Sequence, residues 1–436
     1  MAKRSFFDDI LSVMSSNIFA LILGLLTGIV ISRVLGPEGR GLYTSVYVVP
    51  IIVISFVTFG IRRSAIFHIG RKLFDEEDIV STIYSLLLIT SSIGIIVSGI
   101  VYYFINNSDF TYPIIILALL TIPVRLAVGY SRGIFLGKER FRYANQLKWM
   151  PVFLNLIFVA GFVWWAGFSV MGAILSIFVA YFIVAIYALV VINRSIHIRL
   201  AFIKLIAKSM LKLGAVYALA LLVMQLNYRI DILVLQQLSS FSEVGYYSLG
   251  VSIAERLWQI PFAMGIVIMS RSANVENEDE LNNDVARMLR ISFLIAIIAA
   301  IVLYFITPYL IPFLYGKRFI PSAEIVQMIL PGILMFIIFR ILNSRVAGMG
   351  KPQFAIYVFL PALIVNVFLN YIWIPKYGGL GAAMATNVSY ILGTIAFLII
   401  FSRLTKMSII EIVGYKKEDF NFVASLKNRI FAKWKK

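Results

Sequence analysis

Arginine is the residue that could do chemistry within the apolar stretches of this sequence. Six arginines interrupt long runs of aliphatic and aromatic residues, at Arg125, Arg132, Arg229, Arg256, Arg340 and Arg345. Two carboxylates, Asp231 and Glu255, accompany them. The planar guanidinium fork of arginine matches the geometry of phosphate groups. Six cations beside two anions therefore favour an interior that binds an anionic ligand.

The spacing of these charges argues against pairing along one helix. Arg229 and Asp231 are two residues apart, and Glu255 and Arg256 are adjacent. Side chains meet on a helix surface when they are three or four residues apart, so neither pair shares a face. We therefore expect their partners to come from other helices or from a ligand.

Position within the apolar runs divides the arginines further. A charge at the centre of a bilayer costs about 2.5–3.5 kcal/mol on insertion scales, so a buried arginine faces a cavity or a partner. Arg132 and Arg345 lie near the ends of runs, where we expect their side chains to extend to the membrane interface. Arg125, Arg256 and Arg340 lie deeper, and the sequence leaves a cavity role and a structural role open for each.

Three further arginines each have two possible roles. Arg229 lies nearer the outer end of its run and could serve either role. Arg62 and Arg63 follow the second apolar run at its inner end. They could receive a lipid headgroup, or they could simply mark the cytoplasmic side of the membrane.

The sequence lacks several of the motifs that would indicate an enzyme. It has no cysteine, which excludes disulfides, thiolate metal sites and cysteine nucleophiles. The HExxH and P-loop patterns are absent as well. We therefore expect a protein that is not an enzyme and that uses no cofactor and no metal ion.

The elements that must position these residues are membrane-spanning helices. The 436 residues are 61% hydrophobic and 14% charged, with a mean hydropathy of +0.93, whereas soluble domains carry roughly 25% charged residues. A span needs about 20 mainly apolar residues. Twelve such runs lie near residues 12–34, 42–61, 80–104, 113–135, 149–165, 170–192, 211–236, 244–269, 289–306, 323–347, 353–374 and 380–402. We predict an all-α polytopic membrane protein with twelve transmembrane helices.

Basic residues alternate between the predicted loops. One side of the membrane receives 28 of the 39 Lys and Arg residues, and the other side receives five. Basic loops face the cytoplasm, so this bias predicts a multi-pass protein of the cell membrane with both termini cytoplasmic. The net charge of +18 then reflects topology and lipid attraction, and no nucleic-acid partner is expected.

An internal repeat divides the chain. Gly41 and Tyr43 recur as Gly245 and Tyr247, and Gly172-Ala173 recurs at residues 381–382. Each half holds six predicted spans, an even number, so both halves enter the membrane in the same orientation as parallel repeats. We expect an N-terminal lobe at 1–200, a C-terminal lobe at 201–410 and a basic amphipathic cytoplasmic tail at 411–436 that lies on the inner leaflet.

The segment 31–50 is predicted to form the first helical hairpin of the N-terminal lobe. An apolar run ends near Arg33, the chain turns over eight residues through Gly36-Pro37 and Gly39–Gly41, and a second run follows. The corresponding segment of the second half is 225–252. We expect this turn to be structural and to join two helices on the outer side.

Three segments carry a family resemblance. They are SRVLGPEGRGLYTSVYVV at 32–49, LYGKRFIPSAEI at 314–325, and GKPQFAIYVFLPALIVNVFLNYIWIPKYGGLGAAMATNVSY at 350–390. They resemble the polysaccharide transporter (Wzx-like) branch of the multidrug/oligosaccharidyl-lipid/polysaccharide flippase superfamily. With the twelve runs, the resemblance covers essentially the whole chain.

The resemblance implies two six-helix lobes in a V shape with a cavity lined by the first, second, seventh and eighth helices. It implies passage of a polyprenyl-diphosphate-linked oligosaccharide to the outer leaflet. The residues on those helices are then Arg33, Arg62, Arg63, Arg229 and Arg256 as substrate ligands, with Asp231 and Glu255 as coupling carboxylates. Arg125 and Arg340 lie on other helices and have lower priority.

Two other functions remain open at the level of sequence. A drug or cation antiporter of the same superfamily typically relies on membrane carboxylates in one lobe, which the N-terminal spans lack. A scaffold of a glycan assembly complex would tolerate loss of the buried charges. Expected partners are the membrane, the lipid-linked oligosaccharide, and a glycan polymerase and glycosyltransferases.

Overall fold

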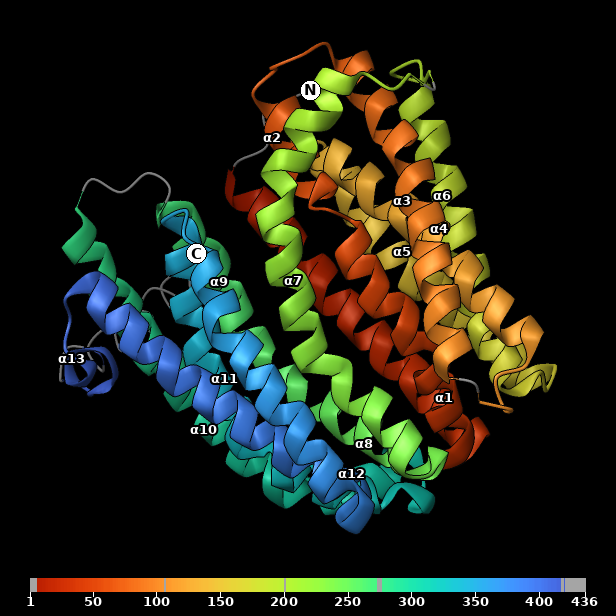
Figure 1. Ribbon diagram of the computed structural model, residues 1–436, viewed down its shortest axis with the longest axis vertical. Coiled ribbons are helices and arrows are strands. Elements are labelled where there is room, and N and C mark those ends of the chain that lie inside the picture. The colour runs from red at the N-terminus through yellow and green to blue at the C-terminus, as the bar shows by residue number, and fades with distance from the viewer. Residues whose placement is uncertain (1–5, 106, 200, 273–276, 417–418, 420–436) are drawn as a thin grey trace, which may run out of the picture. The chain divides into compact units, whose positions relative to one another are not determined.

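The computed structural model describes residues 6–105, 107–199, 201–272, 277–416 and 419, and within these ranges every regular element is a helix (Figure 1). The α-helices are α1 (Phe6–Val57), α2 (Ile61–Gly70), α3 (Glu76–Ile105), α4 (Tyr112–Gly137), α5 (Phe141–Val159), α6 (Ser169–Asn193), α7 (Lys204–Leu238), α8 (Phe241–Ala254), α9 (Gln259–Ser272), α10 (Glu278–Tyr315), α11 (Pro321–Gly348), α12 (Gln353–Thr405) and α13 (Ile409–Val413). A π-helical turn follows α5 (Ala160–Trp165), and 3₁₀ turns lie at Glu255–Trp258 and Lys317–Phe319.

Nine helical segments among the described residues are long and apolar enough to cross a membrane. This confirms the predicted all-α, multi-pass membrane protein. Two of the nine, 15–70 and 353–405, each contain two predicted runs, so the nine segments cover eleven of the twelve. The predicted run 244–269 falls on α8 and α9, which the 3₁₀ turn at Glu255–Trp258 separates. The count of twelve stays a prediction.

The turn near residue 36 is shorter than the eight residues expected from the sequence. Only Gly36 leaves the helical conformation within α1, with φ 68° and ψ −175°. The left-handed region suits glycine because it has no Cβ, and Pro37 can begin the next helical segment because its fixed φ is helical. Arg40 Nη1 reaches back to Gly28 O at 3.3 Å, which a straight helix 12 residues long would not allow.

The chain forms two compact units, and the first comprises residues 1–248 and 311–321. Within it, α4 packs against α2, α3 and α6, and α1 packs against α5 and α7. Buried tyrosines join the helices: Tyr84 contacts Ser131 at 2.8 Å, and Tyr102 donates to Val46 O at 2.6 Å. Burying a polar group requires such a partner, so these hydrogen bonds fix the relative rotation of the helices.

The second unit comprises residues 249–310 and 322–436. Its interior is aromatic: Phe336 and Phe339 of α11 contact Phe359 of α12 with ring centroids 5.4 and 4.4 Å apart. Tyr390 adds a ring 4.5 Å from Phe336. Aromatic pairs at these distances stabilise a core beyond their burial alone. The lobe boundary predicted at residue 200 stays a prediction.

Candidate functional site

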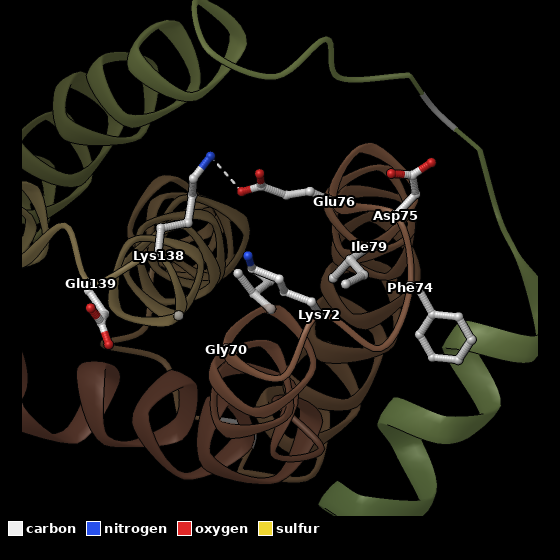
Figure 2. A pocket seen from close by; sticks show the side chains of 10 residues that line it. Gly70, Lys72, Phe74, Asp75, Glu76, Ile79, Lys138 and Glu139 are labelled. Carbon is white, nitrogen blue, oxygen red and sulfur yellow. Dashed lines mark ion pairs between the residues drawn. The ribbon is translucent and has the colours of Figure 1, made fainter.

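A cavity of about 720 Å³ opens where α2 ends, α3 begins and α4 ends. Figure 2 shows Lys138 and Glu76 pointing toward each other from two helices, and their Nζ and Oε1 atoms are 2.5 Å apart. Lys72, Asp75 and Glu139 also line it. Three carboxylates against two ammonium groups make this cavity unsuited to a phosphate-bearing ligand.

The ion pair in this cavity has a counterpart in the second unit. Glu76 lies in the first turn of α3, and Glu278 lies in the first turn of α10. Glu278 Oε2 is 3.9 Å from Arg345 Nη2, near the end of α11. In both units an acidic residue that begins one helix therefore meets a basic residue at the end of the next. We assign both pairs a structural role, since acidic groups are also favoured at helix N-termini.

A second cavity, of about 400 Å³, lies within the first unit and is lined by five basic side chains and no carboxylate. We call it the arginine pocket. Its basic residues are Arg62, Arg63, Arg125, Arg132 and Lys148. Its other lining includes Ser55, Thr58, Tyr181 and Gln225, whose hydroxyl and amide groups can hydrogen-bond to a polar ligand.

Helix α4 supplies one wall of the arginine pocket. Arg125, Gly129 and Arg132 are spaced by four and three residues, which places them on one helix face. A Cβ at Gly129 would meet no atom within 4 Å, in keeping with a wall that faces open space. Helix α2 begins at Ile61, packs against α4, and contributes Arg62 and Arg63 to the lining.

The break between α1 and α2 is held by direct backbone packing. Phe59 and Gly60 both have positive φ, at 39° and 63°. A Cβ on Gly214 of α7 would lie 1.8 Å from Phe59 O, so α7 approaches this break as closely as a glycine permits. Nearby, the buried His68 of α2 bonds through Nε2 to Ser209 Oγ of α7 at 2.8 Å. These contacts fix the start of α2 and therefore the two arginines that follow it.

Arg125 is held in one orientation by tyrosines. Its Nη1 donates to the hydroxyl of Tyr47, and its Cζ lies 5.4 Å from the Tyr47 ring centroid and 5.2 Å from that of Tyr181. A guanidinium over aromatic faces is attracted by the ring quadrupole without being neutralised. Arg125 therefore keeps its full charge and directs it into the pocket.

The remaining cations of the pocket repel one another. Arg62, Arg132 and Lys148 line the same cavity, and its lining contains no carboxylate to offset the repulsion between their charges. Arg132 Nε is buried and has no hydrogen-bond partner among the described residues. Like charges gathered in a partly desolvated space favour a polyanion, because each added negative charge removes part of that repulsion.

The structure places Arg33 elsewhere. Its side chain is exposed, and Nε and Nη2 donate to the carbonyl oxygens of Leu314 and Phe313 at 2.7 and 2.5 Å. These carbonyls belong to the last turn of α10, whose acceptors have no partner within the helix. Arg33 thus caps the C-terminal end of α10.

The pair predicted on α7 is divided between two environments. Arg229 is partly buried and is not among the residues that line the arginine pocket. Asp231 is 1% exposed, and its Oδ2 accepts a hydrogen bond from Tyr247 at 2.8 Å. A buried carboxylate that accepts a hydrogen bond from a hydroxyl group can bind a proton or a cation.

The other predicted residues lie in the second unit. Glu255 and Arg256 occupy the 3₁₀ turn between α8 and α9. Arg340 lies over the ring of Trp258, with its Cζ 5.1 Å from the ring centroid. Arg345 is fully buried and donates through Nε to Asn282 at 2.9 Å. Its burial differs from the interfacial position that its place near the end of a run suggested.

Sequence reasoning missed two members of the arginine pocket. From the sequence, Arg132 is expected at the membrane interface, and Lys148 has no predicted role at a site. The spacing of Arg125, Gly129 and Arg132 along one helix face is the signal that would have grouped the two arginines. Lys148 gave no comparable signal, because its approach to the pocket depends on how α5 packs against α4.

Two family models match the chain. Residues 6–264 match the model described as "Polysaccharide biosynthesis protein", and residues 217–372 match the model described as MatE. The putative O-antigen transporter of Shigella flexneri is 23% identical over 391 residues, which cover 86% of this chain and 92% of that protein. The capsular polysaccharide biosynthesis protein CapF of Staphylococcus aureus is 23% identical over 399 residues, covering 89% and 97% of the two chains.

The fold also recurs among solved structures. The lipid II flippase MurJ in an inward closed conformation superposes with a TM-score of 0.72, at 16% sequence identity and over 96% of each chain. An inward-facing multidrug resistance transporter of the MATE family superposes with a TM-score of 0.71, at 17% identity and over 92% of this chain. At these identities the similarity establishes the fold alone.

Proposed function

This chain belongs to the polysaccharide biosynthesis protein family, within the multidrug/oligosaccharidyl-lipid/polysaccharide flippase superfamily, and from that premise we propose that it moves a lipid-diphosphate-linked oligosaccharide across the cell membrane. The direction we propose is from the cytoplasmic to the outer leaflet, for the synthesis of a surface polysaccharide. Both termini then face the cytoplasm, where most basic loops lie.

The observation that carries this proposal is the arginine pocket. Five basic side chains line a cavity of about 400 Å³ whose lining holds no carboxylate. A diphosphate carries several negative charges and many acceptor oxygens, and arginine forks bind such groups in bidentate fashion. A cationic drug would meet electrostatic repulsion in the same space.

The proposed mechanism assigns separate parts of the substrate to separate surroundings. Arg62, Arg125 and Arg132 hold the diphosphate, while Ser55, Thr58 and Gln225 supply hydrogen bonds to the first sugar hydroxyls. The polyprenyl chain remains in the bilayer, where its apolar surface is already favourable. Alternating access then exposes the pocket to one side of the membrane at a time.

Coupling to an ion is the part of the mechanism that we assign to the carboxylates. Asp231 is buried and accepts a hydrogen bond from Tyr247. We propose that Asp231 or Glu255 binds the proton or cation whose passage drives return of the empty transporter. Arg229 and Arg256 remain proposed substrate contacts at other stages of the cycle, with Arg340 of lower priority. For Arg33, whose donors bind the carbonyls of Leu314 and Phe313, we propose a capping role in place of substrate contact.

The named relatives support the substrate class. One is described as an O-antigen transporter, another as a capsular polysaccharide biosynthesis protein, and a structural neighbour is a lipid II flippase. We propose that the substrate here is likewise a lipid-linked glycan precursor. A glycan polymerase and glycosyltransferases would act after and before the transport step.

A drug or cation antiporter is the second candidate, because residues 217–372 match the MatE model. That match includes Leu221 and Gln225 of the pocket lining but none of the five basic residues of the arginine pocket. The charge of the pocket lining therefore favours the anionic substrate.

A deletion strain provides the test. Loss of the gene should leave lipid-linked oligosaccharide on the cytoplasmic leaflet, and complementation with the parent chain should clear it. Normal surface polysaccharide in the deletion strain, together with lost resistance to cationic drugs, would instead support the antiporter.

A further inference from the structure

The basic residues of the arginine pocket lie at two depths of the predicted spans. Four of them lie at or near the ends of runs that are predicted to face the cytoplasm, namely Arg62, Arg63, Arg132 and Lys148. Arg125 instead lies near the middle of the run 113–135, and Tyr181 lies at the middle of the run 170–192. We call the four residues the entry level of the pocket, and Arg125 forms a deeper level of the same cavity.

Helix α4 sets the distance between the two levels. Arg125 and Arg132 lie on one face of α4 and are seven residues apart, which corresponds to roughly 10 Å at the rise of an α-helix. Pro123, the proline inside α4, precedes both arginines, so the helix between them is uninterrupted. A diphosphate, whose two phosphorus atoms share one bridging oxygen, is shorter than this separation. Both arginines could hold it at once only if their side chains extended toward each other.

Tyr47 instead holds Arg125 away from the entry level. On α1, Tyr47 lies twelve residues before Phe59, which places it about three helical turns from the break that precedes Arg62. Its hydroxyl accepts a hydrogen bond from Arg125 Nη1, and its ring centroid lies 5.4 Å from Arg125 Cζ. The Tyr181 ring lies 5.2 Å from the same atom. These contacts draw the guanidinium of Arg125 toward the middle of the span.

Arg125 therefore presents a positive charge at a depth where charge is costly. Aromatic rings attract a guanidinium without neutralising it, and the lining of the cavity contains no carboxylate. A charged side chain within a membrane span faces a cavity or a partner. The wall between the two levels is open, because a Cβ at Gly129 would meet no atom within 4 Å. An anion at the entry level can reach Arg125 along this wall.

We propose that Arg125, positioned by Tyr47 and Tyr181, is a transfer site that receives the diphosphate from the entry level during transport. This inference rests on the proposed function and adds an order of events to it: the arginines assigned to the diphosphate act in sequence. Transport through a binding site requires affinity high enough for entry and low enough for release, and successive sites meet both needs. The entry level carries four charges and sets the affinity, whereas Arg125 sets the rate of transfer.

Binding and export, measured separately, test this assignment. Binding of inorganic pyrophosphate to the full-length protein in detergent is measured by calorimetry at low ionic strength. Export is measured as surface polysaccharide in complemented deletion strains, normalised to protein amount. Arg125→Gln should keep the Kd for pyrophosphate within about twofold of the parent value and lower export about tenfold or more, whereas Arg132→Gln should weaken binding about tenfold. Equal loss of affinity in the two variants, or normal export in Arg125→Gln, would overturn the transfer site.

Two conservative changes separate positioning from folding. Tyr47→Phe keeps the ring and removes the hydroxyl that binds Arg125, so export should fall about threefold or more while pyrophosphate binding is unchanged. Arg125→Lys keeps the charge and should recover part of the export that Arg125→Gln loses. Tyr84→Phe is the matched control, because it removes a buried hydroxyl contact to Ser131 of α4, at 2.8 Å, outside the pocket lining. Equal export in Tyr47→Phe and Tyr84→Phe would show that Tyr47 does not position Arg125.

Failure of the proposed function would give a different result. The parent chain would then bind no pyrophosphate, and the deletion strain would export polysaccharide normally, which would overturn both proposals. A parent that binds pyrophosphate and restores export, beside an Arg125→Gln variant that matches it in both measurements, would keep the proposed function and reject the transfer site.

Discussion

Gly41 and Gly245 lie in reciprocal contact, each against the backbone of the other's helix. A Cβ on Gly41 would lie 1.7 Å from Phe241 O, and a Cβ on Gly245 would lie 2.0 Å from Pro37 O. Gly41 and Gly245 are 204 residues apart in the repeat, and so are Thr44 and Ser248, whose hydroxyl groups are hydrogen-bonded at 3.4 Å. Two copies of one motif facing each other produce such reciprocity, and only glycine permits it.

Alanine at either glycine should therefore prevent this contact. Gly41→Ala and Gly245→Ala each place a methyl group within 2.0 Å of a carbonyl oxygen, which requires the helices to separate. We expect loss of polysaccharide export with retained membrane expression. Gly99→Ala on α3 is the control, since a Cβ there meets nothing within 4 Å.

Cross-linking reports the same contact directly. A Thr44→Cys and Ser248→Cys double variant should form a disulfide under mild oxidation. This cross-link should stop export, and reduction should restore it. Combining it with Gly41→Ala should abolish the cross-link. Efficient cross-linking in the triple variant would mean that the glycine contact is not required to bring residues 44 and 248 together.

The residues that the structure adds to the arginine pocket give a second prediction. Arg132→Gln and Lys148→Gln each remove one of five charges that share the cavity. A charge-assisted hydrogen bond contributes roughly 1.5–3 kcal/mol, so we expect export to fall about tenfold or more in each. Arg132→Lys should recover part of the activity by keeping the charge. Quantifying surface polysaccharide in complemented deletion strains checks the series.

Arg33 should behave differently from the pocket arginines. Its two donors satisfy carbonyls at the end of α10, so Arg33→Ala should lower the unfolding free energy by about 1 kcal/mol. Transport per folded molecule should change little. Thermal unfolding in detergent, measured beside transport normalised to protein amount, separates the two effects. A large transport defect at unchanged stability would restore Arg33 as a substrate ligand.

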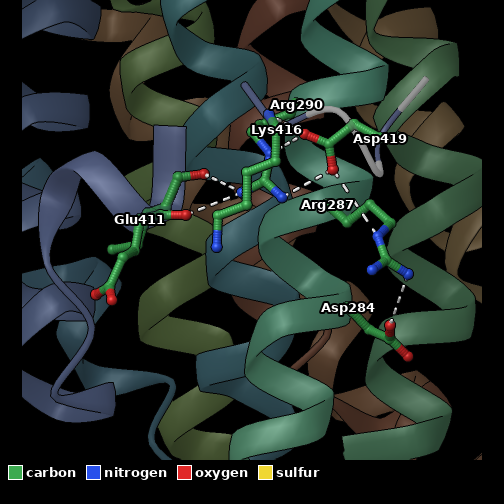
Figure 3. A network of polar contacts seen from close by, with 7 residues as sticks. Asp284, Arg287, Arg290, Glu411, Lys416 and Asp419 are labelled. Atoms are coloured by element: carbon green, nitrogen blue, oxygen red, sulfur yellow. Dashed lines mark hydrogen bonds and ion pairs between the residues drawn. The ribbon is translucent and has the colours of Figure 1, made fainter. Parts of the chain in front are cut away.

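The buried ion pair between Arg290 and Asp419 (Figure 3) should be insensitive to pH near neutrality. Burial raises the pKa of Asp419, but the hydrogen bonds and charge of Arg290 outweigh burial and hold that pKa below its usual range. A lowered folded-state pKa contributes stability above the unfolded pKa, and this contribution is lost as pH falls through the folded value. The stability difference between the parent and Asp419→Asn, roughly 1–3 kcal/mol, should stay constant from about pH 5 to about pH 8.

The membrane helices were the most predictable part of this fold. The predicted run 113–135 corresponds to α4, and 80–104 corresponds to α3, because hydropathy reports burial in lipid. The run predicted to begin at residue 289 belongs to a helix that begins at Glu278, since polar first turns can stay helical outside the bilayer. Hydropathy does not detect the 3₁₀ turn at Glu255–Trp258, because the helix type changes there without a change in polarity.

The sequence predicted the charge of the ligand at the site, but it did not predict all of the residues that line the site. Six arginines against two carboxylates indicated an anionic ligand, and Arg62, Arg63 and Arg125 line the arginine pocket. The role of Arg132 could not be read from its place near the end of a run, because depth along a helix does not say which neighbour a side chain faces. Capping of α10 by Arg33 depends on a contact across 281 positions of sequence, which no local pattern reports.

Transport by the purified protein tests the central claim most directly. Proteoliposomes containing the parent chain should move a fluorescent polyprenyl-diphosphate oligosaccharide between leaflets. The double variant Arg62→Gln and Arg132→Gln should do so at about one tenth of the parent rate or below. Arg194→Gln, an exposed loop arginine outside the arginine pocket, should match the parent. Equal rates for the parent and the double variant would contradict the assignment of the arginine pocket as the diphosphate site.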